Sequence, residues 1–269
     1  MAKQTGLYGI RGKVNGYSYY KQTGVNDTIF RRINEGMSDR VKRGAEYANT
    51  RLNNIEFAQA CKLAGIMGKM VQPKYRPMIL PFSQSNMAKQ VLEVLKADPT
   101  ALAQWGYRGL ALGTNKFPAE ILAGQSKLAF SDFVDNATAE ASTPSLGRSN
   151  VEFDWNFQEG FADLLGTYGA NGVIVRCLVW NVIYKRPDAT TFAPATISLS
   201  AGGAAEQPFQ IDSEEHDMTV NARYPVNIPS GAQVKQIGVM IIMPTRAVGG
   251  TKHVLQEACS FTSFEIETA

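Results

Sequence analysis

The residues best suited to chemistry are the cations and tyrosines that are interleaved near the start of the chain. Lysine and arginine neutralise phosphate, and tyrosine rings offer faces on which bases stack. Tyrosine and arginine are also enriched in protein–protein interfaces, so the pattern alone leaves both kinds of partner open. The cations are Lys13, Lys21, Arg31, Arg32, Arg40, Lys42, Arg43 and Arg51, and the tyrosines are Tyr8, Tyr17, Tyr19, Tyr20 and Tyr47.

A second group of ionisable residues is the acidic run 212–217, which contains His216. Carboxylate oxygens and an imidazole nitrogen ligate divalent cations, so a metal ion is one interpretation of Asp212–Asp217. The spacing matches no established calcium-binding loop, and crowded like charges usually face water, so a solvated hairpin loop is the other. Glu152 and Asp154 alternate with aromatic residues, which is more typical of the outer face of a strand than of a glycosidase pair.

The common catalytic motifs are absent from the sequence. It contains no GxGxxG, GxxxxGKS/T, GxSxG or HExxH pattern, and only 2 histidines. Its 3 cysteines, Cys61, Cys177 and Cys259, each stand among apolar residues, which predicts buried free thiols. We therefore expect a protein that has no enzymatic activity and needs no cofactor or metal.

The spacing of apolar residues predicts the elements that position these groups. Residues 12–33 are predicted to form a two-stranded β-ribbon. A long amphipathic helix is predicted over Ser38–Gln72, which Gly65 and Gly68 could interrupt, and a second helix over Ser85–Ala97. The apolar stripe of the long helix comprises Val41, Ala45, Ala48, Leu52, Ile55, Leu63, Ile66 and Met70.

From Lys127 onward the pattern changes to short apolar runs and two-residue alternation, separated by turn residues. This pattern predicts an antiparallel β-sandwich of about seven strands, with a loop over 138–150. The predicted fold class is α+β, with an N-terminal β-ribbon and helices followed by an antiparallel β-sandwich. We place the basic ribbon-plus-helix region at 1–126 and the sandwich domain at 127–269.

Charge is divided unevenly along the chain, although the net charge is only +3. Residues 1–80 contain 14 Lys and Arg against 5 Asp and Glu, whereas residues 151–269 contain 7 against 13. This asymmetry favours an anionic partner for the first part, or a second copy packed head to tail. No run of about 18 apolar residues occurs, so no membrane partner is expected.

Two segments near the start of the chain carry a recognisable pattern. Its ribbon positions are Gly12, Lys13, Val14, Gly16, Tyr20, Gly24 and Arg31, and its helix positions are Arg51, Phe57, Ala60 and Leu63. With these residues the chain resembles an uncharacterised family of proteins from Bacteroidetes and their phages, in which the second half is β-rich. The chain departs from the family in the order Asn15-Gly16 and in lacking a proline-rich link before the helix.

The resemblance implies a context and no catalytic residue, because the family has no established activity. Its context includes phages with short tails built from many ring-forming proteins. Together with the missing enzyme motifs and the uneven charge, this favours a non-enzymatic structural protein of a virion, made in the host cytoplasm. We expect many copies in a ring, head-tail connector or tail, with copies of itself and other virion proteins as partners, and DNA as a further candidate.

The ribbon and the long helix are the expected contact elements. The ribbon is expected to add its edge to a neighbouring sheet, and the helix to bury its stripe at a subunit boundary. The expected assembly interface comprises Tyr17, Tyr19, Tyr20, Ile29, Phe30, Leu52 and Ile55.

Two alternatives remain open from the sequence. A nucleic-acid-binding protein would use the basic region. Its DNA contacts would be Lys13, Arg31, Arg32, Lys42 and Arg43. A carbohydrate-binding sandwich would use Trp155, Trp180 and Tyr184 as stacking platforms, provided that these rings are exposed.

Overall fold

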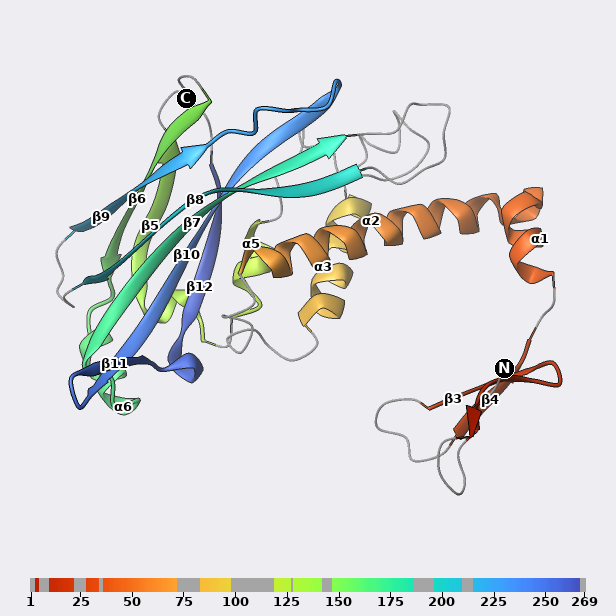
Figure 1. The fold of residues 1–269 in the computed structure, drawn as a ribbon, viewed down its shortest axis with the longest axis horizontal. Helices are drawn as coiled ribbons and strands as arrows, with labels where there is room; N and C mark the ends of the chain where they lie inside the picture. The colour runs from red at the N-terminus through yellow and green to blue at the C-terminus, as the bar shows by residue number, and fades with distance from the viewer. Residues whose placement is uncertain are drawn as a thin grey trace. The chain divides into compact units, whose positions relative to one another are not determined.

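The computed structural model describes residues 3–4, 10–21, 28–33, 36–71, 83–97, 119–126, 128–141, 147–185, 196–209 and 215–266. The chain forms two compact units, Met1–Asn53 and Asn54–Ala269, called the first and second unit below. The predicted α+β class is confirmed, because a small sheet and helices precede a β-rich second half (Figure 1). The boundary predicted at residue 126 differs from that between the compact units, which meet inside a helix.

The first unit contains a small antiparallel sheet in the order β1-β2-β3-β4. The predicted two-stranded ribbon is wrong, because residues 10–32 contribute three strands to this sheet. Asn15 and Gly16 form the two-residue turn between β2 and β3, and both have the positive φ that such a tight hairpin requires, 48° and 78°. The strands are β1 (Lys3–Gln4), β2 (Ile10–Val14), β3 (Tyr17–Lys21) and β4 (Thr28–Arg32).

The helical segment after this sheet is broken at Gly44, whereas the sequence suggested a single helix that Gly65 or Gly68 could interrupt. Helix α1 (Met37–Arg43) ends there, and a 3-10 turn, η1 (Ala45–Tyr47), leads into α2 (Ala48–Met70). Gly44 has an extended backbone, with φ −69° and ψ 133°. A Cβ atom at this position would lie 2.8 Å from the Arg40 carbonyl oxygen, so the sharp turn depends on glycine.

Within the second unit, three helices share one hydrophobic core with a sheet, the first of them through its part after Asn53. They are α2, α3 (Ser83–Ala97) and α5 (Ala119–Ala123), and α3 confirms the helix predicted over Ser85–Ala97. The proline-containing link predicted after α2 lies outside the described residues. Among the described helices, none has the length and apolarity needed to cross a membrane.

The second unit contains two antiparallel sheets. One has the order β11-β10-β7-β8, with β12 also paired to β10, and the other has the order β5-β6-β9. The strand β10 changes partner from β12 to β11 at Pro244, which has no backbone N–H to donate. The strands are β5 (Val134–Ala141), β6 (Arg148–Phe157), β7 (Gly172–Lys185), β8 (Thr196–Phe209), β9 (Glu215–Arg223), β10 (Ala232–Val248), β11 (Thr251–Val254) and β12 (Ser260–Ile266).

These elements form three layers, with the larger sheet in the middle (Figure 1). One face of β7 and β10 packs against α2, α3 and α5, and the other face packs against β5, β6 and β9. Both strands are therefore buried on two sides, which explains their nearly continuous apolar sequences. A short helix, α6 (Phe161–Thr167), and the 3-10 turns η3 (Phe130–Asp132) and η4 (Gln256–Ala258) complete the described elements.

The predicted loops 138–150 and 212–217 are partly wrong, because strand pairing extends into both. Strand β5 shifts its register between Asp135 and Thr138, with Asn136 at φ 48°, and then stays paired to β6 as far as Ala141. Strand β6 begins at Arg148, and β9 begins at Glu215. Residues that are typical of turns form strands here, because their backbones hydrogen-bond to a strand that is distant in sequence.

Candidate functional site

The sheet of the first unit has an aromatic face, formed by Tyr17, Tyr19 and Phe30. Tyr19 and Phe30 are directly paired, and the Phe30 ring contacts both tyrosines, with centroid distances of 5.9 Å to Tyr17 and 6.0 Å to Tyr19. Phe30 is 63% exposed and Tyr17 38% exposed. None of the described residues in Met1–Asn53 is buried, so this cluster lies at the surface of its unit.

The opposite face of this sheet carries Lys13 and Arg31, and we call it the basic face. Both residues pair with Ser18 of the central strand β3, one from each side. Tyr20 and Ile29, which pair with each other, also lie on the basic face. The predicted interface set is therefore divided between two faces of one sheet. The predicted DNA contacts are divided as well, because Arg32 pairs with Tyr17 on the aromatic face.

The remaining predicted DNA contacts, Lys42 and Arg43, are exposed in the last turn of α1. Their helix is fixed to the start of α2 by Arg51, whose Nη1 donates hydrogen bonds to the carbonyls of Val41 (3.0 Å) and Gly44 (2.7 Å). The Val41 carbonyl lies in the last turn of α1, where carbonyls have no partner inside the helix, so the guanidinium supplies one. Arg51 thus links the end of α1 to the start of α2.

The two apolar helix residues in the predicted interface differ in exposure. Leu52 is half-buried, and Ile55 is only 8% exposed within the single chain. Ile55 therefore offers little surface to a partner, whereas the exposed rings of Tyr17, Tyr20 and Phe30 offer much more.

The sheet β5-β6-β9 carries six carboxylates on its outer face, which we call the acidic face. The face follows from the strand register: Glu152 pairs with Glu140, and Asp154 pairs with Asp217. Five of the six side chains are exposed and Asp154 is half-buried, which confirms that Glu152 and Asp154 face outward from their strand. The acidic face consists of Asp135, Glu140, Glu152, Asp154, Glu215 and Asp217.

The electrostatic effect of this crowding falls on Asp154, at the centre of the face. Its pKa is raised above the ordinary value, first by partial burial and then by repulsion from the carboxylates of Asp217, Glu152, Glu215 and Glu140. The described side chains of His, Cys, Asp and Glu form no group of three or more suited to a metal ion. A metal site in the run 212–217 stays untested, because its first three residues lie outside the described residues.

His216 of the same strand points to the other side of the sheet. Its ring lies 5.9 Å from Trp155, 5.1 Å from Phe157 and 5.3 Å from Phe209, measured between centroids. The alternation along β9 thus separates the imidazole from its neighbouring carboxylates Glu215 and Asp217. An arrangement in which these three side chains share one cation is not present.

The aromatic residues considered for sugar stacking are mostly inside the protein. Trp155 is 1% exposed between the two sheets, and Tyr184 is 2% exposed between the larger sheet and the helices. Trp180 is half-buried, and its Nε1 donates to the Met70 carbonyl at 3.0 Å. Because stacking needs an accessible ring face, Trp155 and Tyr184 cannot provide a carbohydrate platform in this structure.

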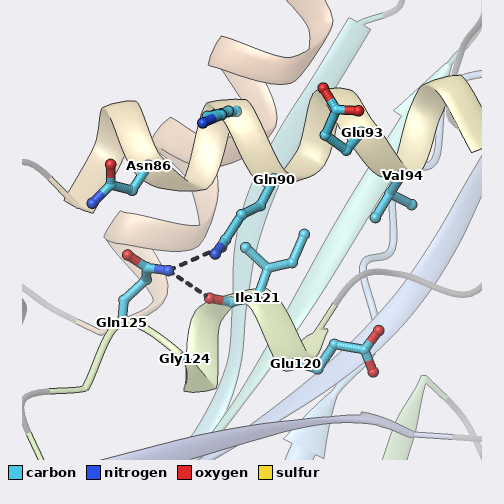
Figure 2. Close-up of a pocket in the computed structure, with 9 residues that line it drawn as sticks. Asn86, Gln90, Glu93, Val94, Glu120, Ile121, Gly124 and Gln125 are labelled. Atoms are coloured by element: carbon cyan, nitrogen blue, oxygen red, sulfur yellow. Dashed lines mark hydrogen bonds between the residues drawn. The ribbon is translucent and has the colours of Figure 1, made fainter.

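A groove of about 690 Å³ lies between α3 and the segment around α5, as Figure 2 shows. The buried amide of Gln125 donates from Nε2 to the Gln90 side chain (3.1 Å) and to the Ile121 carbonyl (3.2 Å). Glu93 pairs with Lys96 at 3.0 Å, and Glu120 is exposed. No nucleophile and base meet among the described residues that line this groove, so it presents no catalytic arrangement.

The three cysteines are free thiols, as predicted, although only two are buried. Cys177 and Cys259 are buried, and Cys61 is half-buried. Burial raises the pKa of the Cys177 thiol, which keeps it protonated and unreactive.

The acidic face is the feature that sequence reasoning missed. Its residues come from three strands, and Asp135 and Glu140 stand in a segment that was predicted only in part as strand. The available signal was acidic residues at two-residue spacing, namely Glu152 with Asp154 and Glu215 with Asp217. That spacing indicates that the two residues of each strand share a face, but it does not predict which strands lie next to each other.

Comparison with known proteins leaves the chain without an assigned family. No protein-family model matches it, and no curated protein matches it. Among solved structures it is similar to Spo0M, a sporulation control protein from Bacillus subtilis, at 9% sequence identity and a TM-score of 0.27. The match covers 51% of this chain and 48% of Spo0M, so the chain spans about half the length of that protein. A likeness of this degree carries no argument about function.

Proposed function

We propose that this chain is a non-enzymatic structural protein of a bacteriophage particle, present in many copies and assembled through its first unit. The observation that most supports the proposal is the exposed aromatic face of Tyr17, Tyr19 and Phe30, on a sheet unit with no buried residue among those described. Large exposed rings of this kind are favoured anchors in protein interfaces.

The physical need for a partner follows from the size of the sheet. Its strands are two to five residues long, and small sheets that lack a hydrophobic layer are marginally stable in water. Covering one large aromatic side chain contributes about 1.5 to 3 kcal/mol. Strand β4 lies at an edge of the sheet, where a strand from a neighbour could add to it.

The proposal of a phage particle rests on the sequence pattern of residues 12–33 and of the long helix, which resembles that of a family of proteins from Bacteroidetes and their phages. A ring, a head-tail connector and a tail component are all multi-copy assemblies in which one subunit surface meets a different surface on the next. We therefore propose virion localisation, with copies of itself and other virion proteins as partners.

The self-assembly step is tested by measuring the mass of the purified chain in solution by sedimentation velocity, at tens of micromolar. We expect assemblies larger than a monomer, and we expect Phe30→Thr to weaken them. Phe57→Gln is the matched control, because Phe57 is also an exposed phenylalanine, 56% exposed, but lies on α2. A monodisperse monomer at all concentrations, or equal effects of the two substitutions, would contradict assembly through the aromatic face.

Nucleic-acid binding is the second candidate, and the basic face supports it. Lys13 and Arg31 pair with Ser18 from its two sides on this face. Lys42 and Arg43 are exposed at the end of α1. Phosphate contacts of this kind give an affinity that falls steeply with salt. Binding of duplex DNA that weakens with salt and with Lys13→Ala/Arg31→Ala would support this function, and no DNA retention at low salt would reject it.

A further inference from the structure

The acidic face concentrates negative charge on one side of a sheet. Its six carboxylates lie on the outer layer of the second unit, on the side of β5-β6-β9 that faces away from the hydrophobic cluster between the sheets. Among the described residues no ion pair joins any of the six to a cation. Arg148 and Arg223, which pair at one end of the same face, are the nearest cations along β6 and β9.

The arrangement is unfavourable for an isolated chain. Glu140 faces Glu152, and Asp154 faces Asp217, and like charges directly opposite each other destabilise a pair of strands. The pKa of Asp154 is raised first by partial burial and then by this same repulsion. A folded surface that keeps such pairs gains stability when a cationic partner covers it.

The basic face of the first unit carries the opposite charge to the acidic face. The first unit, Met1–Asn53, has 10 Lys and Arg against 4 Asp and Glu. On its basic face Lys13 and Arg31 stand two strands apart, which is about 10 Å. Glu140 and Asp217, on the two outer strands of the acidic sheet, are also two strands apart. Neither Lys13 nor Arg31 takes part in an ion pair among the described residues.

We propose that the acidic face of one copy binds the basic face of the first unit of a second copy. This inference rests on the proposed multi-copy assembly and names the two surfaces that meet. The two surfaces differ, so each copy offers one of each, and the contact repeats head to tail. The aromatic face, on the other side of the same sheet, stays available for a further contact.

The test exchanges charges between the two surfaces. One variant carries Glu152→Lys and Asp217→Lys, and the other carries Lys13→Glu and Arg31→Glu. Both lysines of the first variant come to lie opposite a carboxylate, Glu140 or Asp154, so this variant is expected to fold at least as well as the original chain. Glu159→Lys/Asp163→Lys is the matched control, because it changes the same charge at exposed positions off the acidic face.

Association is measured by sedimentation velocity at low and high salt. We expect each surface variant alone to associate about tenfold more weakly than the original chain, and the control to associate normally. Mixing the two surface variants is expected to restore association, because each supplies the surface that complements the other. Association by the original chain is expected to weaken at high salt.

Several outcomes would overturn the inference. Normal association of the Glu152→Lys/Asp217→Lys variant would show that the acidic face takes no part. If the mixture does not recover association, the basic face binds a surface other than the acidic face of a second copy. Loss of DNA binding in the Lys13→Glu/Arg31→Glu variant, with unchanged self-association, would assign the basic face to nucleic acid. A monomeric original chain would instead reject the multi-copy assembly, whereas assembly lost only in Phe30→Thr would reject this inference alone.

Discussion

The indole Nε1 of Trp180 donates a hydrogen bond to the backbone carbonyl of Met70 over 3.0 Å. Met70 is the last residue of α2, and Trp180 lies in β7, 110 residues further along the chain. A carbonyl in the last turn of a helix has no acceptor role inside that helix. The indole supplies its donor and so fixes the end of α2 to the central sheet.

Trp180→Phe should remove this hydrogen bond and lower the free energy of unfolding by about 1 kcal/mol beyond the loss of ring contacts. The clearest measurement is hydrogen exchange of the amides in the last turn of α2, which should speed up. Trp155→Phe is the control, because the Trp155 Nε1 is buried without a hydrogen-bond partner among the described residues. If both variants leave exchange at the end of α2 unchanged, the bond has no anchoring role.

Gln59 and Gln125 are equally buried glutamines, but only the Gln125 side chain has hydrogen-bond partners among the described residues. Both are 2% exposed, but the Gln59 amide has no partner among the described residues, whereas Gln125 donates to Gln90 and Ile121. Gln59→Leu should therefore raise the free energy of unfolding by about 1 to 2 kcal/mol, and Gln125→Leu should lower it by a similar amount. Urea denaturation of both variants is the measurement, and equal shifts of the same sign would contradict this explanation.

Gly238 lets β10 pass close to an aromatic ring of the smaller sheet. A Cβ atom there would lie 3.0 Å from two ring carbons of Phe153 and 3.4 Å from the Ile266 side chain. Gly238→Ala should overpack the core and lower the free energy of unfolding by about 1 to 3 kcal/mol. Phe153→Leu in the same chain should recover part of the loss, because the smaller side chain makes room.

Gly166→Ala is the matched control for that substitution. Gly166 lies in α6, and a Cβ atom there would meet nothing within 4 Å. Alanine should be neutral or slightly stabilising at this position, by up to about 1 kcal/mol. Thermal unfolding of the two variants compares them directly, and a Gly238→Ala protein as stable as Gly166→Ala would show that the contact with Phe153 is loose.

Asp154→Asn should change how stability depends on pH. The raised pKa of Asp154 means that the folded protein keeps this proton at pH values where the unfolded chain has released it. The contribution of Asp154 to the free energy of unfolding therefore falls as pH rises above about 4, the ordinary value for aspartate. Asparagine removes that decline, so the variant should gain stability over the original chain as pH rises and lose the gain in acid.

Denaturation at several pH values between acid and neutral measures this difference. Asp163→Asn is the control, because Asp163 is an exposed aspartate of α6 and lies outside the acidic face. It should not gain stability as pH rises. Parallel pH curves for Asp154→Asn and the original chain would show that neither burial nor the neighbouring carboxylates raise the pKa of Asp154.

Local spacing was enough to predict several elements of this protein. The apolar residues of α3 recur at helical spacing, and Glu152 and Asp154 alternate with the aromatic residues of β6, so both the helix and the outward face of the strand follow from sequence. The change from helical to β-rich sequence and the isolated, apolar setting of Cys177 and Cys259 are local properties as well.

Tertiary contacts decided the rest, because they depend on strand register and on partners distant in sequence. The register of β3 with β4 places Tyr19 and Phe30 on one face and Tyr20 on the other. Only the side-by-side pairing of β5, β6 and β9 gathers six carboxylates from three segments into one surface. A sequence displays the period within each strand, which fixes alternate faces, but it does not display which strands become neighbours.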